Sequence, residues 1–312
     1  MTVLQNLMTG PARQPRLSTL LATLALVGSA PLSPAAEEIK IDRGRPMLEL
    51  YGELVQRYGY FVTYEDAPPD AQDVVAGKLP NGLEYRNLIL KPMVFHVSAR
   101  GAAAGAANKF GTAAVAASIR PLGPDVIEPL LAEYNASGNP GRFTAIYDGG
   151  YAHIVPAGRP VHGKMVDFQP ILSTIVHVNQ QEGKCWDLLT NTLNEVRQIR
   201  GISITNILPP AFALGGKRCS LRGQTLPARQ VLIQLLDGLG QRPPGAVFPP
   251  DRFVWALVYD PTTDAWFLGT DLVPPQEQIE PANGTAAPPA AALEQPTRNR
   301  LAAPAPATPV KK

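Results

Sequence analysis

Cysteine, histidine and charged residues are scarce in this chain of 312 residues, which has two cysteines, four histidines and 17% charged side chains. The nucleophile motif G-x-S-x-G and the zinc motif H-E-x-x-H are both missing. A net charge of +2 provides no basic field of the size that nucleic-acid-binding proteins usually carry. The sequence therefore predicts no nucleic-acid partner, no metal and no cofactor, and it favours a non-enzymatic protein.

Long hydrophobic runs are missing beyond the N-terminus, so we predict that this is not an integral membrane protein, because a spanning helix needs about 20 apolar residues. The shorter apolar run at residues 17–27 follows Arg13 and Arg16, and small residues including Ser33-Pro34-Ala35 come after it. This layout is typical of a secretory signal peptide. We expect residues 1–36 to be that signal peptide and the protein to be exported to a periplasmic or extracellular compartment.

Large apolar side chains are nearly absent from residues 274–312, where Pro and Ala dominate. Such a composition cannot offset the entropy lost on ordering, so it predicts a disordered tail that acts as a linker or spacer. Removing both ends leaves residues 37–273. This length is sufficient for one large domain, or for two small ones with their own cores.

A β-type run followed by an amphipathic helix and a further β-type run occurs four times, at residues 39–64, 115–155, 173–207 and 218–270. The fourth helix is the clearest, because apolar residues recur at helical spacing from Ala228 to Leu239, with Gly240 as the stop signal. We predict an α+β fold of repeated βαβ(β) units, in which small mixed sheets are each covered by helices. The units are expected to group as residues 37–165 and 166–273.

The two cysteines, Cys185 and Cys219, are expected to form a disulfide, because an even number of cysteines in an exported chain favours pairing. Cys185 lies where the third predicted helix begins, and Cys219 lies in the strand that opens the fourth unit. The bridge would join these two units. In the chain-entropy model it would stabilise the fold by about 3 to 4 kcal/mol.

The segment from Cys219 to Gly240, followed by the strand 253–259 and a second strand, resembles the short domain at the N-terminus of secretins and TonB-dependent receptors. In that family a strand leads through a turn of small residues into a helix, and a strand pair follows. Residues 46–64 look like a more distant copy of the same pattern. The shared pattern consists mostly of the spacing of core residues, so it indicates the fold more than the activity. The resemblance implies a periplasmic module that binds another envelope protein.

An acidic group follows the first predicted unit, in a loop that contains proline; it comprises Glu65, Asp66, Asp70 and Asp73. Carboxylates in such a group could ligate Ca²⁺, or supply the acid and base of glycoside hydrolysis. Their spacing matches no known Ca²⁺-binding loop. A solvated loop is therefore the simpler interpretation, and a secreted hydrolase is the least favoured hypothesis.

Three aromatic residues, Trp255, Tyr259 and Trp266, gather around one predicted turn. Tryptophans near strand ends can form sugar-binding platforms, although the alternation of Phe253, Trp255 and Leu257 favours the core for at least half of this group. The leading hypothesis is a cell-envelope protein that binds another protein, by strand addition at a sheet edge. The alternative is a protein that binds peptidoglycan or another polysaccharide through these aromatic residues.

Overall fold

A computed structural model describes residues 37–42, 44–97, 123–207, 216–240 and 252–274. The predicted signal peptide and nearly all of the predicted tail lie outside these ranges. Within them, helices and strands alternate along the chain, which confirms the predicted α+β class. No helix in the same ranges combines the length and the apolar composition needed to span a membrane.

The N-terminal half contains a β-α-β unit and a β-α-β-β unit. The first unit is β1 (Glu37–Ile41), α1 (Pro46–Gln56) and β2 (Val62–Glu65). The second is β5 (Met93–Val97), α3 (Pro124–Ala136), β6 (Arg142–Asp148) and β7 (Tyr151–Val161). β1 and β5 form an antiparallel pair, whereas β7 pairs in parallel with β2 and antiparallel with β6. Between the units lies the hairpin of β3 (Val74–Lys78) and β4 (Glu84–Leu88), and β8 (Lys164–Asp167) pairs with β7.

The C-terminal half repeats this order. Its first unit is β9 (Ile175–Val178), β10 (Gln181–Lys184), α4 (Cys185–Arg200) and β11 (Ile204–Ile207). Its second unit is β12 (Arg218–Leu221), β13 (Gln224–Pro227), α5 (Ala228–Gly240), β14 (Arg252–Asp260) and β15 (Ala265–Val273). β9 pairs with β13 and β10 with β12, while β15 pairs in parallel with β11 and antiparallel with β14. The strands β11, β15 and β14 therefore have the same topology as β2, β7 and β6.

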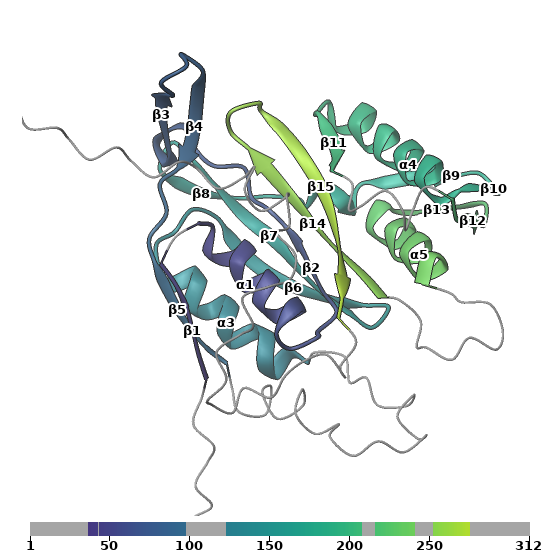
Figure 1. Cartoon of the computed structure of the whole chain (residues 1–312), viewed down its shortest axis with the longest axis horizontal. Coiled ribbons are helices and arrows are strands. Elements are labelled where there is room, and N and C mark those ends of the chain that lie inside the picture. The colour runs from purple at the N-terminus through teal and green to yellow at the C-terminus, as the bar shows by residue number, and fades with distance from the viewer. Residues whose placement is uncertain (1–36, 43, 98–122, 208–215, 241–251, 275–312) are drawn as a thin grey trace, which may run out of the picture. The chain divides into compact units, whose positions relative to one another are not determined.

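We refer to residues 37–167 as the N-terminal repeat and to residues 171–273 as the C-terminal repeat. Strand β14 of the second pairs in parallel with β2 of the first, through Ala256 with Tyr64 and Leu257 with Glu65. The two three-stranded parts thus join, with β8, into a seven-stranded sheet in the order β11-β15-β14-β2-β7-β6 (Figure 1). Each repeat therefore contributes a small mixed sheet, as expected. The two small sheets are, however, joined into one continuous sheet that includes strands from both predicted regions, 37–165 and 166–273.

The helices of the two repeats pack on opposite faces of the shared sheet. Tyr64 of β2 contacts Tyr51 of α1 and Phe143 of β6, which in turn contacts Tyr134 of α3. The next residue of β2, Glu65, binds α5 instead. Because successive residues of a strand point to opposite faces, the centre of the sheet is covered on both sides. All four residues of β2 are accordingly buried.

Helix ends follow the expected chemistry. Pro46 occupies the first turn of α1, where its missing N–H costs no helical bond. Helix α4 ends at Gly201, whose left-handed backbone (φ 64°) suits a residue without a Cβ. In α5 the apolar residues that recur from Ala228 to Leu239 are buried, which confirms the helix predicted from their spacing.

Candidate functional site

Glu65, the first member of the predicted acidic group, is a buried residue at the junction of the two repeats. Its side chain is 2% exposed and lies 3.3 Å from the guanidinium of Arg229 in α5, which is 7% exposed. The backbone N–H groups of Ile171 and Leu172, in the short 3-10 helix η3 (Ile171–Ser173), also donate to its carboxylate. Burial raises the pKa of Glu65, while Arg229 and these N–H groups act to lower it.

Asp66 is enclosed as well. Its carboxylate accepts hydrogen bonds from the Tyr64 hydroxyl at 2.8 Å and from the backbone N–H of Ala67 at 3.0 Å, and it pairs with Arg45. The backbone N–H of Tyr259, in the other repeat, also donates to it at 3.3 Å. The solvated-loop interpretation is therefore wrong for Glu65 and Asp66, because both carboxylates hold the fold together.

Asp70 and Asp73 do lie at the surface, where Asp70 is the N-cap of the 3-10 helix η1 (Ala71–Asp73) and Asp73 is its last residue. The Asp70 carboxylate accepts from the N–H groups of Ala71 and Gly163, and these bonds help to lower its pKa. The Asp73 carboxylate accepts from the backbone N–H of Asp70. Among the described residues, no cluster of three or more His, Cys, Asp or Glu side chains is arranged to hold a metal ion.

Of the three aromatic residues, Tyr259 and Trp266 come together, whereas Trp255 contacts other rings inside the protein. Trp255 is 1% exposed and Trp266 is 4% exposed. Trp255 contacts the rings of Tyr151 and His153, and Trp266 contacts Tyr259 with ring centroids 5.2 Å apart. A sugar-binding platform needs an exposed ring face, and neither tryptophan offers one. The prediction that they form such a platform is therefore wrong. Of the group, only Tyr259 is partly exposed.

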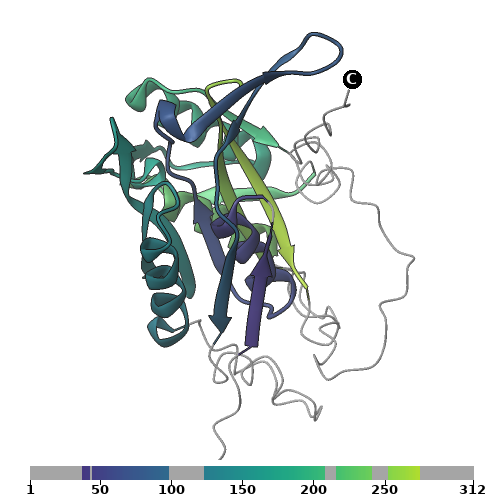
Figure 2. The same ribbon diagram turned by 90° about the vertical axis from the view of Figure 1, so that its left-hand side faces the viewer.

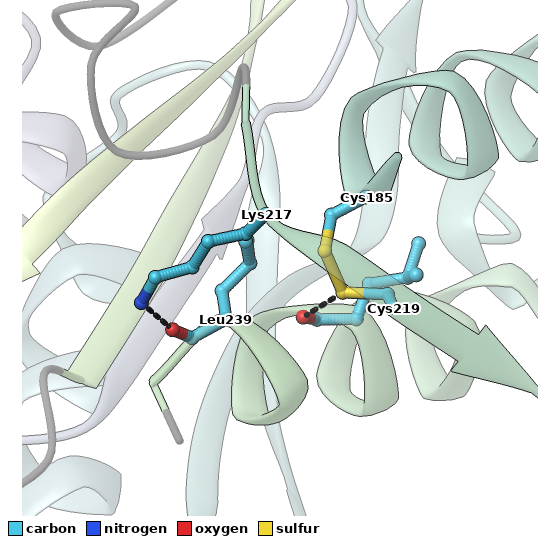
Figure 3. The surroundings of a disulfide bond; sticks show 5 residues. Cys185, Lys217, Cys219 and Leu239 are labelled. Carbon is cyan, nitrogen blue, oxygen red and sulfur yellow. Dashed lines mark hydrogen bonds between the residues drawn. A yellow bond between two sulfur atoms is a disulfide. The ribbon is translucent and has the colours of Figure 1, made fainter. Parts of the chain in front are cut away.

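The predicted disulfide is present between Cys185, at the first turn of α4, and Cys219 in β12 (Figure 3). Both cysteines are buried, and the Cys219 sulfur lies 3.5 Å from the carbonyl oxygen of Leu235 in α5. Beside it, the Lys217 ammonium donates to the carbonyl of Leu239. The bridge therefore joins the third and fourth units, as predicted, by linking the first turn of α4 to β12.

His153 lies in the same buried layer as Glu65. Its ring is stacked near Tyr151, and its Nδ1 is 2.7 Å from the Thr63 hydroxyl. Burial, followed by the nearby charge of Arg229, lowers its pKa to about 3. At neutral pH the imidazole is therefore uncharged, and with its ring fully enclosed it serves packing rather than contact with a substrate.

Several strand edges are blocked by polar side chains from helices. On β6, Phe143 donates its N–H to Asn135 Oδ1 and accepts from Asn135 Nδ2, both at 2.9 Å. On β5, the His96 N–H donates to Glu133 of α3 at 3.1 Å. An unpaired edge strand invites another chain to pair with it, so each of these contacts protects an edge.

In the C-terminal repeat, the outer edge of β9 is blocked in the same way. The N–H of His177 in β9 donates to Glu195 of α4 at 2.7 Å, and the imidazole Nδ1 lies 3.5 Å from the same carboxylate. His96 and Glu133 make the corresponding ring contact at 3.0 Å. In each repeat, therefore, a helix glutamate accepts a hydrogen bond from the backbone N–H of a strand histidine and also lies beside the imidazole of that histidine.

Strand β11 forms the other end of the seven-stranded sheet, and no described strand pairs with its outer side. Beside it, a shallow depression of about 410 Å³ is lined by Asn194, Arg197 and Gln198 of α4 and by Ile202. Arg197 is exposed and donates to Asn194 at 3.0 Å, but it forms no ion pair within the described part of the chain. The β11 edge therefore combines open backbone groups with a cationic border.

The β3–β4 hairpin offers a second exposed surface, and Figure 2 shows this blue hairpin projecting beyond the main sheet. Val75 is 50% exposed and Leu83 is 62% exposed. The Thr262 hydroxyl, in the turn between β14 and β15, accepts from the N–H of Arg86 and donates to its carbonyl. This contact blocks the middle of the β4 edge and leaves apolar side chains toward solvent.

Comparison of the chain with family models, with curated proteins and with solved structures found no match. The resemblance to the short domain of secretins and TonB-dependent receptors therefore stays a prediction. Sequence reasoning missed Arg229 and the residues that block the strand edges. A signal for Arg229 did exist, because its position three residues before Leu232 lies along the apolar stripe of α5, and an arginine that is buried there needs a partner.

Proposed function

We propose that the mature chain is an exported cell-envelope protein that binds another protein by adding a strand to an edge of its seven-stranded sheet. One observation carries this proposal: side chains block the edges of β4, β5, β6 and β9, whereas β11 has an open outer side within the described residues. Natural sheets protect edges that are not used for pairing. An unprotected edge beside protected ones is what strand addition requires.

Export is supported by the disulfide, because structural disulfides persist in oxidising compartments and are rare in the cytosol. The repeated order of strand, helix and strand pair is consistent with the resemblance to envelope modules. The polysaccharide alternative is not carried forward, because both tryptophans are enclosed. The hydrolase alternative is not carried forward either, because Glu65 and Asp66 bind the protein itself.

The test is capture of a partner from the native cell envelope with residues 37–312, beside a variant in which both ends of the main sheet are disabled. Asn206→Pro and Ala145→Pro each place a proline on an end strand of this sheet. We expect a stoichiometric protein partner with the unmodified chain and its loss with the double variant. Equal capture by a folded double variant would contradict strand addition, and retention on isolated peptidoglycan alone would restore the polysaccharide alternative.

A further inference from the structure

The hydrogen bonds of β11 show which of its backbone groups are open. The N–H of Trp266 in β15 donates to the carbonyl of Ser203 at 2.8 Å, and Ile204 is the residue opposite Trp266. Alternate residues of a strand turn their backbone groups to opposite edges. Ser203 and Thr205 therefore face β15, whereas Ile204 and Asn206 present their N–H and C=O groups to the outer edge.

The opposite end of the sheet is less accessible. On β6, Phe143 faces outward because its N–H and C=O bind Asn135, and Ala145 and Tyr147 face the same way by alternation. The first of these three positions is thus filled by a side chain of α3. An incoming strand would have to displace Asn135 before it could pair along β6, whereas on β11 no described side chain hydrogen-bonds to the backbone of Ile204 or Asn206.

The chemistry beside β11 restricts what can bind there. Ile202, two residues before β11 begins, lines the depression together with Asn194, Arg197 and Gln198 of α4. A strand added at the start of β11 would therefore lie beside the depression. Arg197 has no carboxylate partner among the described residues, and Arg200 donates to Gln169 rather than to an acid. The last turn of α4 therefore carries two arginines and no acidic residue.

We propose, building on the proposed function, that β11 is the docking edge and that its occupant is an extended peptide segment of another protein with an acidic side chain placed over Arg197. Backbone bonds to Ile204 and Asn206 supply affinity that is independent of sequence, and the acidic side chain supplies selectivity. A second copy of this chain fits less well, because pairing through its own β11 would bring another cationic end of α4 to this edge.

The test uses labelled eight-residue peptides of alternating Val and Thr with one Glu, and the same peptides with Lys in place of Glu. Binding to residues 37–312 is measured by fluorescence anisotropy, and backbone amide exchange is followed by NMR. We expect slower exchange at Ile204 and Asn206, and a preference for Glu of up to about fivefold, the size expected of an exposed ion pair. Arg197→Ala should remove that preference.

Asn206→Pro and Ala145→Pro form the matched pair of variants, since each removes one outward N–H from an end of the sheet. We expect Asn206→Pro to weaken peptide binding by about tenfold or more and Ala145→Pro to leave it unchanged. Circular dichroism and thermal unfolding establish that both variants fold. For Arg197→Ala the matched control is Arg218→Ala, at an exposed arginine of β12.

The outcomes separate this inference from the proposed function. Protection of Ala145 and Tyr147 in place of Ile204 and Asn206 would leave strand addition standing and overturn the assignment to β11. Equal affinity for the Glu and Lys peptides would overturn the acidic occupant. Protection of Ile204 and Asn206 that rises with protein concentration, without peptide, would make a second copy the occupant. Absence of protection at every edge, with the peptides and with any captured partner, would overturn strand addition itself.

Discussion

The buried ion pair between Glu65 and Arg229 provides the sharpest test of how the two repeats are held together. Glu65 belongs to β2 of the N-terminal repeat and Arg229 to α5 of the C-terminal repeat, and their charged atoms lie 3.3 Å apart. The perturbation is Arg229→Met, which keeps most of the side-chain length and removes the charge. The comparison variants are Glu65→Gln and the double substitution.

The magnitude follows from the geometry and the burial. At 3.3 Å, two unit charges attract by about 5 kcal/mol with an effective dielectric constant of about 20, and the cost of removing both from water offsets much of this. Removing one partner leaves the other unpaired, which we expect to cost about 3 to 5 kcal/mol. The double variant leaves no buried charge, so it should lose less than either single variant, and the sum of the two single losses should exceed its loss by at least about 3 kcal/mol.

The pH dependence has a definite sign. Burial raises the pKa of Glu65 in the folded protein, and Arg229 is the strongest opposing influence. Without Arg229 the folded pKa rises further above the unfolded value, so the folded state holds a proton that the unfolded state releases in that window. Stability then falls as pH rises through the window. Relative to the unmodified protein, Arg229→Met should therefore be less stable at pH 8 than at pH 5.

The assay is urea unfolding at both pH values, followed by tryptophan fluorescence, to which the enclosed Trp255 contributes. The double variant should show no such difference between pH 5 and pH 8. Additive losses in the single and double variants, within about 0.5 kcal/mol, would refute the coupling. An equal loss for Arg229→Met at both pH values would refute the protonation argument.

Three further predictions follow from other contacts. Replacing Cys185 and Cys219 with Ala should lower the free energy of unfolding by about 3 to 4 kcal/mol, measured by urea titration beside the intact disulfide. Because the pKa of His153 is lowered to about 3, the unfolded state binds its proton first, so stability should fall as pH drops below about 6.5, and less so in His153→Gln. Asn135→Ala should cost about 1 kcal/mol by removing its two bonds to Phe143 and should increase self-association in sedimentation.

Each of these has a result that would contradict it. Unchanged stability without the disulfide would mean that packing alone holds the third and fourth units together. An identical acid slope in His153→Gln would assign the slope to other groups. A stable, monomeric Asn135→Ala would show that β6 needs no protection, which would weaken the comparison between β6 and β11.

Local patterns determined much of the fold. The apolar period from Ala228 to Leu239 and the stop at Gly240 determine α5, and the turn at 260–264 determines the β14–β15 hairpin. The β6–β7 hairpin likewise follows a local signal, because Asp148-Gly149-Gly150 separates two β-type runs. These elements were predictable because spacing and turn chemistry act within a few residues of the chain.

Only the tertiary structure decided how the units combine. Val254, Ala256 and Val258 of β14 alternate with Phe253, Trp255 and Leu257, yet all three are buried as well. The reason is that β14 pairs with β2 inside the seven-stranded sheet, and α1 covers the face that Ala256 shares with Tyr64. The sequence also left Glu65 as a loop carboxylate, since its partner Arg229 lies 164 residues away. Pairing of distant strands, burial of charge and the protection of an edge depend on neighbours brought together by folding. The candidate edge at β11 could therefore be recognised only once the strand order was known.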